Sequence, residues 1–402
     1  MINFEYYNPA KIIFGKGVEN GVGREVAKYG KRVLLHYGGG SIKRNGLYDR
    51  VVTSLKAEGL YVAELGGVQP NPRLSLVRKG VEICRENRID FILAVGGGST
   101  IDSSKAIAAA MRCKDDIWDY YLYDDKPIEG ALPVGVVLTI PAAGSESSDS
   151  SVITNEDGNY KRYIGGECLI PKFAFMNPEV TFTMPPHQIA NGCSDIVAHL
   201  MERYFTRVKH VDFTDRLIEG AIRTILYHGP MALENPTDYD VRAEIMWAGT
   251  VAHNNLLNTG RIGDWASHDI EHELSAQYDI EHELSAQYDI AHGAGLSIVF
   301  PAWMKYVYKT DIDKFVQFAV RVFDVSLAFD DPEKIVFEMI ARLESWYRKM
   351  GLPTRLSDVG IGEEHLREMA EKCLAERDGR NGLGNFRALH VEDIYRIYKL
   401  AL

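Results

Sequence analysis

Short apolar runs alternate with segments of helical character over the first third of the chain, and this alternation constrains the fold more than any other feature. The apolar runs lie at residues 32–37, 60–65, 90–95 and 134–140, and residues 1–15 form a further strand candidate. Strands that alternate with helices are typical of an α/β fold, in which helices cover both faces of a parallel sheet.

The pattern changes near residue 185, where strand-like runs give way to longer stretches of 3.6-residue periodicity. Pro185-Pro186 predicts a helix start there, because proline is tolerated in the first turn of a helix. A chain of 402 residues is also too long for one small core. We therefore predict an α/β domain at residues 1–180 and an all-helical domain at residues 181–402, with a ligand in the cleft between them.

Charge and cysteine content narrow the range of partners. The net charge of -11 disfavours nucleic acid or an anionic membrane as the main partner. The five cysteines are far apart and form no CxxC pair, which indicates free thiols in a reducing compartment. Neither a signal peptide nor an apolar run of membrane-spanning length is visible. We therefore expect a cytoplasmic globular protein.

A tandem repeat interrupts the helical half. Residues 270–279 and 280–289 have the same ten-residue sequence. A solenoid needs several repeats of longer period. A recent duplication, a cloning artefact or a sequence error each explains the second copy.

Two Gly-Gly-Gly-Ser loops, at residues 38–41 and 96–99, each leave an apolar run and open a helical segment. Glycines allow the backbone to approach a phosphate, and a helix N-terminus offers unpaired N–H groups. One such loop is often an ordinary turn, but two in the same context favour a dinucleotide. The second loop, followed by Asp102 and Lys105, suits the pyrophosphate, although its spacing differs from GxGxxG.

The first loop is expected near the adenosine ribose. No acidic residue follows it to bind the ribose 2′-hydroxyl; Ser41, Lys43 and Arg44 follow instead, which favours NADP(H) over NAD(H). The alternative is that Lys43 and Arg44 are simply solvated. Residues 139–146 are candidates for the wall of an adenine or nicotinamide pocket, and Lys161 for a contact with a cofactor phosphate or hydroxyl.

Acidic and imidazole side chains recur at helical spacing in the second half. Asp195 and His199 are four residues apart, as are His268 and His272, so each pair shares one helix face. His292 opens the next apolar helix. One carboxylate with several imidazoles suits Fe²⁺ or Zn²⁺ rather than Ca²⁺ or Mg²⁺. The sequence therefore predicts a transition-metal site in the helical half.

With these motifs, nearly the whole chain resembles the iron-containing alcohol dehydrogenases, in particular the group of NADP-linked aldehyde reductases and butanol dehydrogenases. The segments that carry the resemblance are residues 8–15, 37–41, 70–72, 95–99 with Asp102 and Lys105, 139–146, 191–195 with His199 and Glu202, 264–268 and 290–295.

The resemblance implies a dehydroquinate synthase-like fold, with a Rossmann-like domain and a helical domain. It also implies a homodimer joined partly by the N-terminal strand. One divalent ion is implied per subunit, held by Asp195, His199, His268 and a third histidine, with His272 facing the cleft. The implied cofactor contacts are Gly38, Gly39, Gly40, Ser41, Asn71, Gly96, Gly97, Gly98, Ser99, Asp102, Thr139, Ala143 and Lys161. Ala143 stands where the family often has threonine.

The repeat leaves two candidates for the remaining metal ligand. The family spacing from His268 reaches His282 in the second copy, and His292 lies ten residues further on. We expect His292, because moving its apolar helix would expose several core side chains at about 1.5–3 kcal/mol each. Extruding one polar copy costs less, because loop-closure entropy grows slowly with length.

The predicted activity is reversible hydride transfer between NAD(P)(H) and a primary, butanol-like alcohol or its aldehyde. His272 is the candidate proton relay, with an orienting role as the alternative, and Asp102 is the second candidate catalytic residue. The competing hypotheses are a polyol dehydrogenase acting on glycerol-like substrates, a metallohydrolase, and a metal-binding structural protein without turnover.

Overall fold

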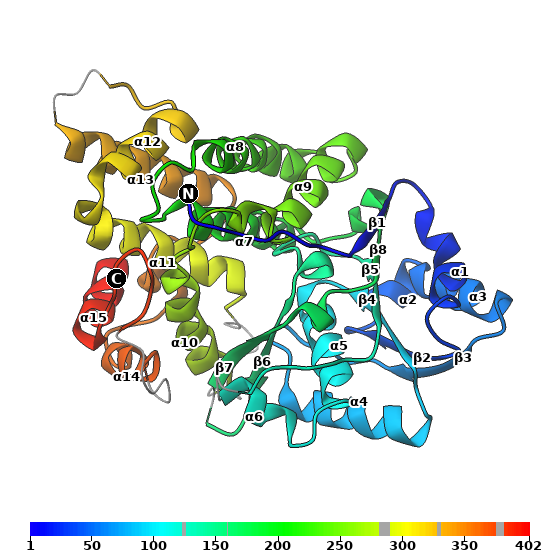
Figure 1. Cartoon of the computed structure of the whole chain (residues 1–402). Helices are drawn as coiled ribbons and strands as arrows, with labels where there is room; N and C mark the ends of the chain where they lie inside the picture. Colours follow the sequence, from blue (N-terminus) through cyan, green and yellow to red (C-terminus); the bar gives the residue numbers. More distant parts are fainter. Residues whose placement is uncertain (123–125, 159, 281–289, 328–330, 375–381) are drawn as a thin grey trace. The chain divides into compact units, whose positions relative to one another are not determined.

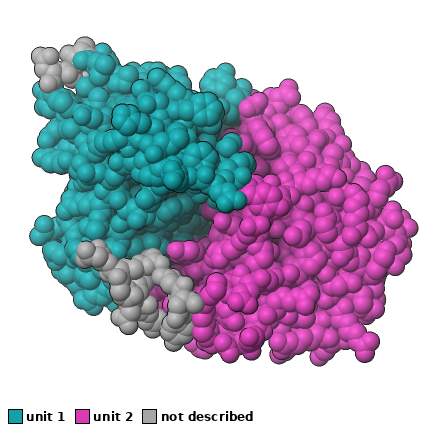
Figure 2. Space-filling view, in the orientation of Figure 1, with its two compact units in different colours: residues 1–6, 186–234, 255–402 teal, residues 7–185, 235–254 magenta. Residues whose placement is uncertain are grey.

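The computed structural model describes the whole chain except residues 123–125, 159, 281–289, 328–330 and 375–381. Its contacts divide the chain into two compact units (Figure 2). The sheet-containing unit comprises Tyr7–Pro185 and Asn235–Asn254, and the helical unit comprises Met1–Tyr6, Pro186–Glu234 and Asn255–Leu402. The domain boundary expected at residue 180 stays a prediction.

A six-stranded parallel sheet forms the core of the first unit, in the order β1-β8-β5-β4-β2-β3 (Figure 1). The strands are β1 (Lys11–Phe14), β2 (Arg32–Tyr37), β3 (Tyr61–Leu65), β4 (Phe91–Gly96), β5 (Val134–Leu138) and β8 (Phe173–Met176). The predicted α/β fold is confirmed. The strand expected over residues 1–15 is shorter than predicted, since only residues 11–14 pair with β8.

Helices bury both faces of this sheet, and the side-chain alternation of β2 shows how. Val33 and Leu35 join one apolar cluster with residues of α1 and α3, whereas Leu34 joins another with residues of α4 and α5. Successive strand residues point to opposite faces, so a continuous apolar run is what a doubly covered strand requires. The helices of this unit are α1 (Val22–Val26), α2 (Ser41–Arg44), α3 (Leu47–Ala57), α4 (Leu74–Glu86), α5 (Gly98–Ala110), α6 (Ile117–Leu122) and α9 (Tyr239–Ala252).

Two features of this unit escaped the sequence patterns. One is an antiparallel hairpin of β6 (Ser150–Asn155) and β7 (Tyr160–Gly165). The other is α9, which follows two helices of the helical unit in the sequence but belongs to the sheet-containing unit. Its Thr250 Oγ1 donates a hydrogen bond of 2.5 Å to Glu146, in the segment after β5. Its position depends on contacts between residues about a hundred positions apart.

The second unit consists of helices grouped around α11 (His292–Val307), which contacts α7, α10, α13 and α15. Most residues of α11 are buried, and Leu296, Phe300 and Trp303 are among its buried side chains. The other helices are α7 (Pro186–Tyr204), α8 (Asp212–Glu234), α10 (Ala266–Ile280), α12 (Ile312–Phe323), α13 (Pro332–Lys349), α14 (Leu366–Lys372) and α15 (Val391–Ala401). Among the described residues, no helix is both long enough and apolar enough to cross a membrane.

Candidate metal centre and nucleotide loops

Helix α7 carries Asp195, His199 and Glu202 along one buried face. Their spacing of four and then three residues places them one above the other on the helix. His199 Nε2 lies 3.4 Å from Asp195 Oδ1. A single helix therefore presents a carboxylate and an imidazole side by side.

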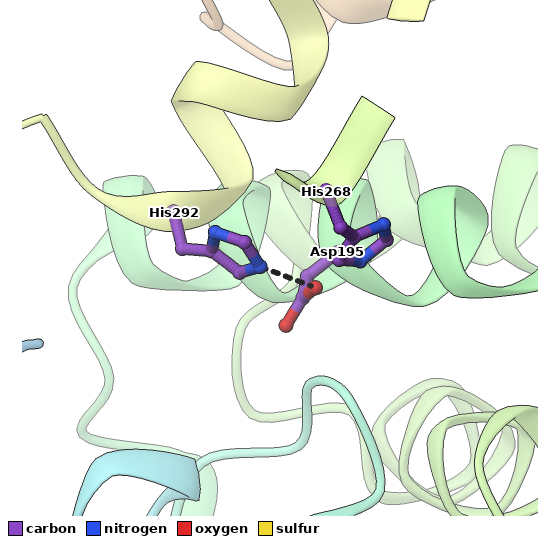
Figure 3. Close-up of side chains that lie close together, drawn as sticks. All are labelled: Asp195, His268 and His292. Carbon is purple, nitrogen blue, oxygen red and sulfur yellow. Dashed lines mark ion pairs between the residues drawn. The ribbon is translucent and has the colours of Figure 1, made fainter. Parts of the chain in front are cut away.

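The start of α11 approaches α7 very closely, which places His292 beside Asp195. A Cβ atom on Gly293 would lie 2.1 Å from the backbone oxygen of Asn191, so glycine is needed for this contact. Ser194 Oγ donates a hydrogen bond of 2.6 Å to the Gly293 carbonyl. As a result, His292 Nε2 lies 3.8 Å from Asp195 Oδ1 (Figure 3).

Asp195, His268 and His292 come together from three different helices, α7, α10 and α11 (Figure 3). One potential ligand atom of each lies within 4.8 Å of the others. His199 is next to this group, with its ring centroid 4.4 Å from that of His268. The four residues predicted from the sequence thus lie close together, whereas His282 falls outside the described residues.

Two fully buried glutamates accept hydrogen bonds from Nδ1 of two of the imidazole rings. Glu202 Oε1 accepts hydrogen bonds from the His268 backbone N–H at 3.0 Å and from its Nδ1 at 2.8 Å, and Glu202 Oε2 accepts from Trp265 N–H at 2.7 Å. Burial raises the pKa of Glu202, while the two backbone donors lower it. Glu271 accepts a hydrogen bond from Nδ1 of His292. With Nδ1 protonated, each ring keeps Nε2 available as a ligand.

The donor set fits a divalent transition metal. One carboxylate and imidazole nitrogens are preferred by Fe²⁺ and Zn²⁺ and do not discriminate between them. The buried partners on Nδ1 are the arrangement found behind metal-bound histidines in general. Asp195, His268 and His292, with His199 beside them, are the residues that would hold the ion.

His272 lies at the edge of this cluster. Its ring centroid is 5.6 Å from that of His292, and its ligand atoms belong to a second close group with Glu271 and His292. The residue missed by the sequence patterns is Glu271, which stands out in the sequence only as part of the repeat. Its position three residues after His268, on a face with buried neighbours, was the available signal.

The two glycine loops occupy neighbouring positions in the sheet-containing unit. They follow β2 and β4, whose last pairs include Tyr37 opposite Val95. From β2 the chain passes to β3 on one side and then returns to β4 on the other. This reversal point, at the carboxyl ends of parallel strands, is where open α/β sheets bind nucleotides.

The loops also combine tight packing with open backbone. A Cβ on Gly96 would lie 2.3 Å from Thr100 Oγ1, so the turn into α5 has no room for a side chain. At Gly39, Gly40 and Gly98, an added Cβ would meet nothing within 4 Å among the described residues. A phosphate can therefore approach the backbone there.

Asp102 and Lys105 of α5 make contacts within the unit. Asp102 accepts hydrogen bonds from Ser145 Oγ at 2.5 Å and from Val152 N–H at 3.0 Å, and burial raises its pKa. Lys105 donates to the Ser148 carbonyl at 2.8 Å, and burial lowers its pKa to about 8. Together, the two side chains hold β6 and the segment before it against α5.

The remaining predicted cofactor contacts lie in the same unit. Thr139 N–H donates to the Gly96 carbonyl at 3.0 Å, which places its segment beside the second glycine loop. Asn71 is buried, with a left-handed backbone (φ 50°), and Lys161 is buried on β7. Ala143 lies in the turn after β5. Their roles in cofactor binding stay predictions.

Lys43 is more than a solvated residue. Its Nζ lies over the rings of Tyr37 and Tyr48, at 4.9 and 4.7 Å from their centroids, and 3.9 Å from Glu64 Oε2. Glu64 also accepts hydrogen bonds from both tyrosine hydroxyls. Glu64 lies near the end of β3, so an acidic group does stand beside the first glycine loop, although it does not follow that loop in the sequence.

Comparison with protein families gives matches to both halves of the chain. The family described as iron-containing alcohol dehydrogenase matches residues 9–178. The family described as Fe-containing alcohol dehydrogenase, C-terminal, matches residues 189–283 and 279–402. The two C-terminal matches overlap inside the repeat, as expected when one family segment is present twice.

Individual proteins and solved structures are similar over the full chain. A probable NADH-dependent butanol dehydrogenase of Bacillus subtilis is 44% identical over 100% of both chains. The NADPH-dependent aldehyde reductase YqhD of Escherichia coli is 37% identical over 100% of both chains. The crystal structure of an NADH-dependent butanol dehydrogenase of Thermotoga maritima matches with a TM-score of 0.92 at 41% identity, covering 99% of this chain and 98% of the other.

Proposed function

The chain belongs to the iron-containing alcohol dehydrogenase family and is an NAD(P)H-linked alcohol dehydrogenase or aldehyde reductase, and we propose a metal-dependent route for this reaction. The proposed substrates are a short primary alcohol, such as butanol, and its aldehyde. The proposed metal ligands are Asp195, His199, His268 and His292. The observation that carries the proposal is the convergence of Asp195, His268 and His292 within 4.8 Å.

When bound, the divalent ion supplies a Lewis acid that stabilises negative charge on the substrate oxygen. The chain contributes an anionic ligand in Asp195. Glu202 and Glu271 orient the rings of His268 and His292 through Nδ1. Hydride chemistry belongs to the nicotinamide cofactor, whose pyrophosphate the open glycine loops are suited to receive.

We propose that His272 relays the alcohol proton, because its ring lies 5.6 Å from His292 without joining the group around Asp195. Replacing His272 with Ala should lower turnover while the metal content stays unchanged. Loss of metal in that variant would show an orienting role instead. A catalytic role for Asp102 stays a prediction, and its internal hydrogen bonds support a role in holding the second glycine loop.

For the cofactor, we propose NADP(H), because Lys43 provides a positive charge near the first glycine loop. NAD(H) is the second candidate, because Glu64 lies 3.9 Å from Lys43 and its carboxylate would repel a 2′-phosphate. Relatives that are 42–44% identical are named NADH-dependent, and the 37% identical relative is named NADPH-dependent.

We also propose a homodimer in a reducing compartment, the cytoplasm. Strand β1 pairs only with β8 among the described strands and so has an open edge. Met1, Ile2, Phe4, Tyr6 and Tyr7 expose large apolar side chains near it in the sequence. All five cysteines are free thiols, as a reducing compartment favours.

The deciding experiment measures oxidation of NADPH and of NADH by absorbance. The protein is stripped of metal, reloaded with Fe²⁺ or Zn²⁺, and given butanal or glyceraldehyde. We expect metal-dependent oxidation with butanal as the better substrate. Equal rates with and without metal would refute the metal-dependent route, and a preference for glyceraldehyde would favour the polyol dehydrogenase hypothesis.

A further inference from the structure

We propose that Glu271 is a positioning residue of the metal centre, which fixes the His292 ring so that its Nε2 is the coordinating atom. The proposal rests on the metal site proposed above. It goes beyond that site because it assigns a function to a residue of the repeated segment and to only one of its two copies.

The contacts of Glu271 leave its carboxylate little freedom. The side chain is fully buried. One carboxylate oxygen accepts a hydrogen bond from His292 Nδ1, and the other accepts from Ser275 Oγ, one turn further along α10. A neutral imidazole whose Nδ1 carries the proton presents an unprotonated Nε2. For His292, Nε2 is the atom that lies 3.8 Å from Asp195.

The neighbouring helix is shaped around this carboxylate. A Cβ atom on Gly295 of α11 would lie 2.6 Å from Glu271 Oε1 and 2.7 Å from its Cγ. Any larger residue at position 295 would force the Glu271 side chain to shift. The pairing of Gly295 with Glu271 is therefore a built feature of the α10–α11 contact.

A second carboxylate of the site has the same arrangement. Glu202 is fully buried and accepts from Nδ1 of His268 at 2.8 Å. In each of these two rings, Nδ1 thus donates to a glutamate, and Nε2 remains as the potential ligand atom. A carboxylate in this position makes the imidazole a stronger ligand and prevents the ring from turning over.

The repeat supplies a matched control for Glu271. Glu281 occupies the same position in the second copy, with the same ten-residue surroundings in sequence, and lies outside the described residues. If the first copy holds the site, Glu271 and Glu281 must differ in effect although their local sequences agree. If the second copy holds it, the effects are exchanged.

A competing role for Glu271 is direct ligation. Glu271, His272 and His292 also form a close group, which a second ion would use. The two roles differ in stoichiometry. An orienting glutamate leaves one ion per chain, whereas a ligand of a second site gives two ions in the native protein and one after its replacement.

The test uses the full chain with Glu271→Gln, Glu281→Gln and Asp195→Asn. Each protein is stripped of metal and titrated with Zn²⁺ against a chelator, and its Co²⁺ form is examined by visible absorption. We expect Glu271→Gln to bind Zn²⁺ about 10–100-fold more weakly, with one ion per chain and a shifted Co²⁺ spectrum. Glu281→Gln should match the native protein in affinity and spectrum.

Native zinc affinity in Glu271→Gln would overturn the proposal, and weakened binding in Glu281→Gln alone would assign the role to the second copy instead. Two ions per native chain with one in Glu271→Gln would also overturn it. A merely structural role would lower the melting temperature but leave the Co²⁺ spectrum of the loaded protein unchanged, which also contradicts the proposal. Equal affinity of native protein and Asp195→Asn would instead refute the metal site itself.

Discussion

Replacing Gly293 with Ala tests whether the close approach of α11 to α7 creates the metal centre. The added Cβ would lie 2.1 Å from the backbone oxygen of Asn191, and real Cβ contacts are essentially never shorter than 3.0 Å. The start of α11 and the facing turn of α7 must therefore separate by about 0.9 Å or more. His292 precedes Gly293 directly, so this separation changes its position relative to Asp195.

This shift is large compared with what a metal site tolerates, since ligand distances vary by only about 0.2 Å. The same shift strains the 2.6 Å hydrogen bond from Ser194 to Gly293. Overpacking of this kind costs about 1–3 kcal/mol of folding free energy. We expect Gly293→Ala to fold with a lower melting temperature and to bind Zn²⁺ much more weakly than the native protein.

The assay is chelator competition for Zn²⁺ together with thermal unfolding of the metal-free protein. Gly220→Ala is the control, because Gly220 is an exposed position in α8 with nothing within 4 Å of an added Cβ among the described residues. Alanine there should stabilise the helix slightly. Native zinc affinity in Gly293→Ala would refute the reasoning.

Three further predictions follow from other parts of the structure. Burial lowers the pKa of His36 from 6.5 to about 4, so its stabilising contribution is complete above pH 6.5 and is lost as the pH falls towards 4. This loss amounts to about 3 kcal/mol of unfolding free energy. Between pH 7 and pH 4, the unfolding free energy of His36→Leu, measured with denaturant, should therefore fall less than that of the native protein. An equal fall in both proteins would contradict the prediction. Deleting residues 280–289 should preserve metal content and turnover, because the first copy already supplies the buried face of α10 and the contact to His292; loss of the metal would show that the second copy is required. Glu64→Gln should raise the ratio of kcat/KM for NADPH to that for NADH, because it removes a negative charge 3.9 Å from Lys43, and an unchanged ratio would place the 2′-position elsewhere.

The sheet and its two glycine loops could be predicted from the sequence because their signals are local. A doubly covered strand must be apolar at successive positions, and residues 32–37 and 90–95 are. A glycine loop between such a run and a helix has few structural alternatives. The hairpin of β6 and β7 was missed because it lies in a polar stretch, where neither periodicity nor apolar content marks the strands.

The candidate metal ligands divide in the same way. Asp195 and His199 could be proposed as a pair from the sequence, because a spacing of four places both side chains on one helix face. No local pattern decides whether His282 or His292 is the remaining metal ligand. The structure places His292 beside Asp195 through the contact of Gly293 with Asn191, which lies about a hundred residues earlier in the chain.

The sequence by itself determined the α/β fold and the family, and it located the two glycine loops and the candidate metal ligands, because each depends on residues near one another in the chain. Only the tertiary structure showed that His292 lies beside Asp195, that Glu202 and Glu271 accept hydrogen bonds from the His268 and His292 rings, and that Glu64 lies beside Lys43. Those relations join separate helices and strands, and only packing brings their side chains within hydrogen-bonding or ion-pair distance.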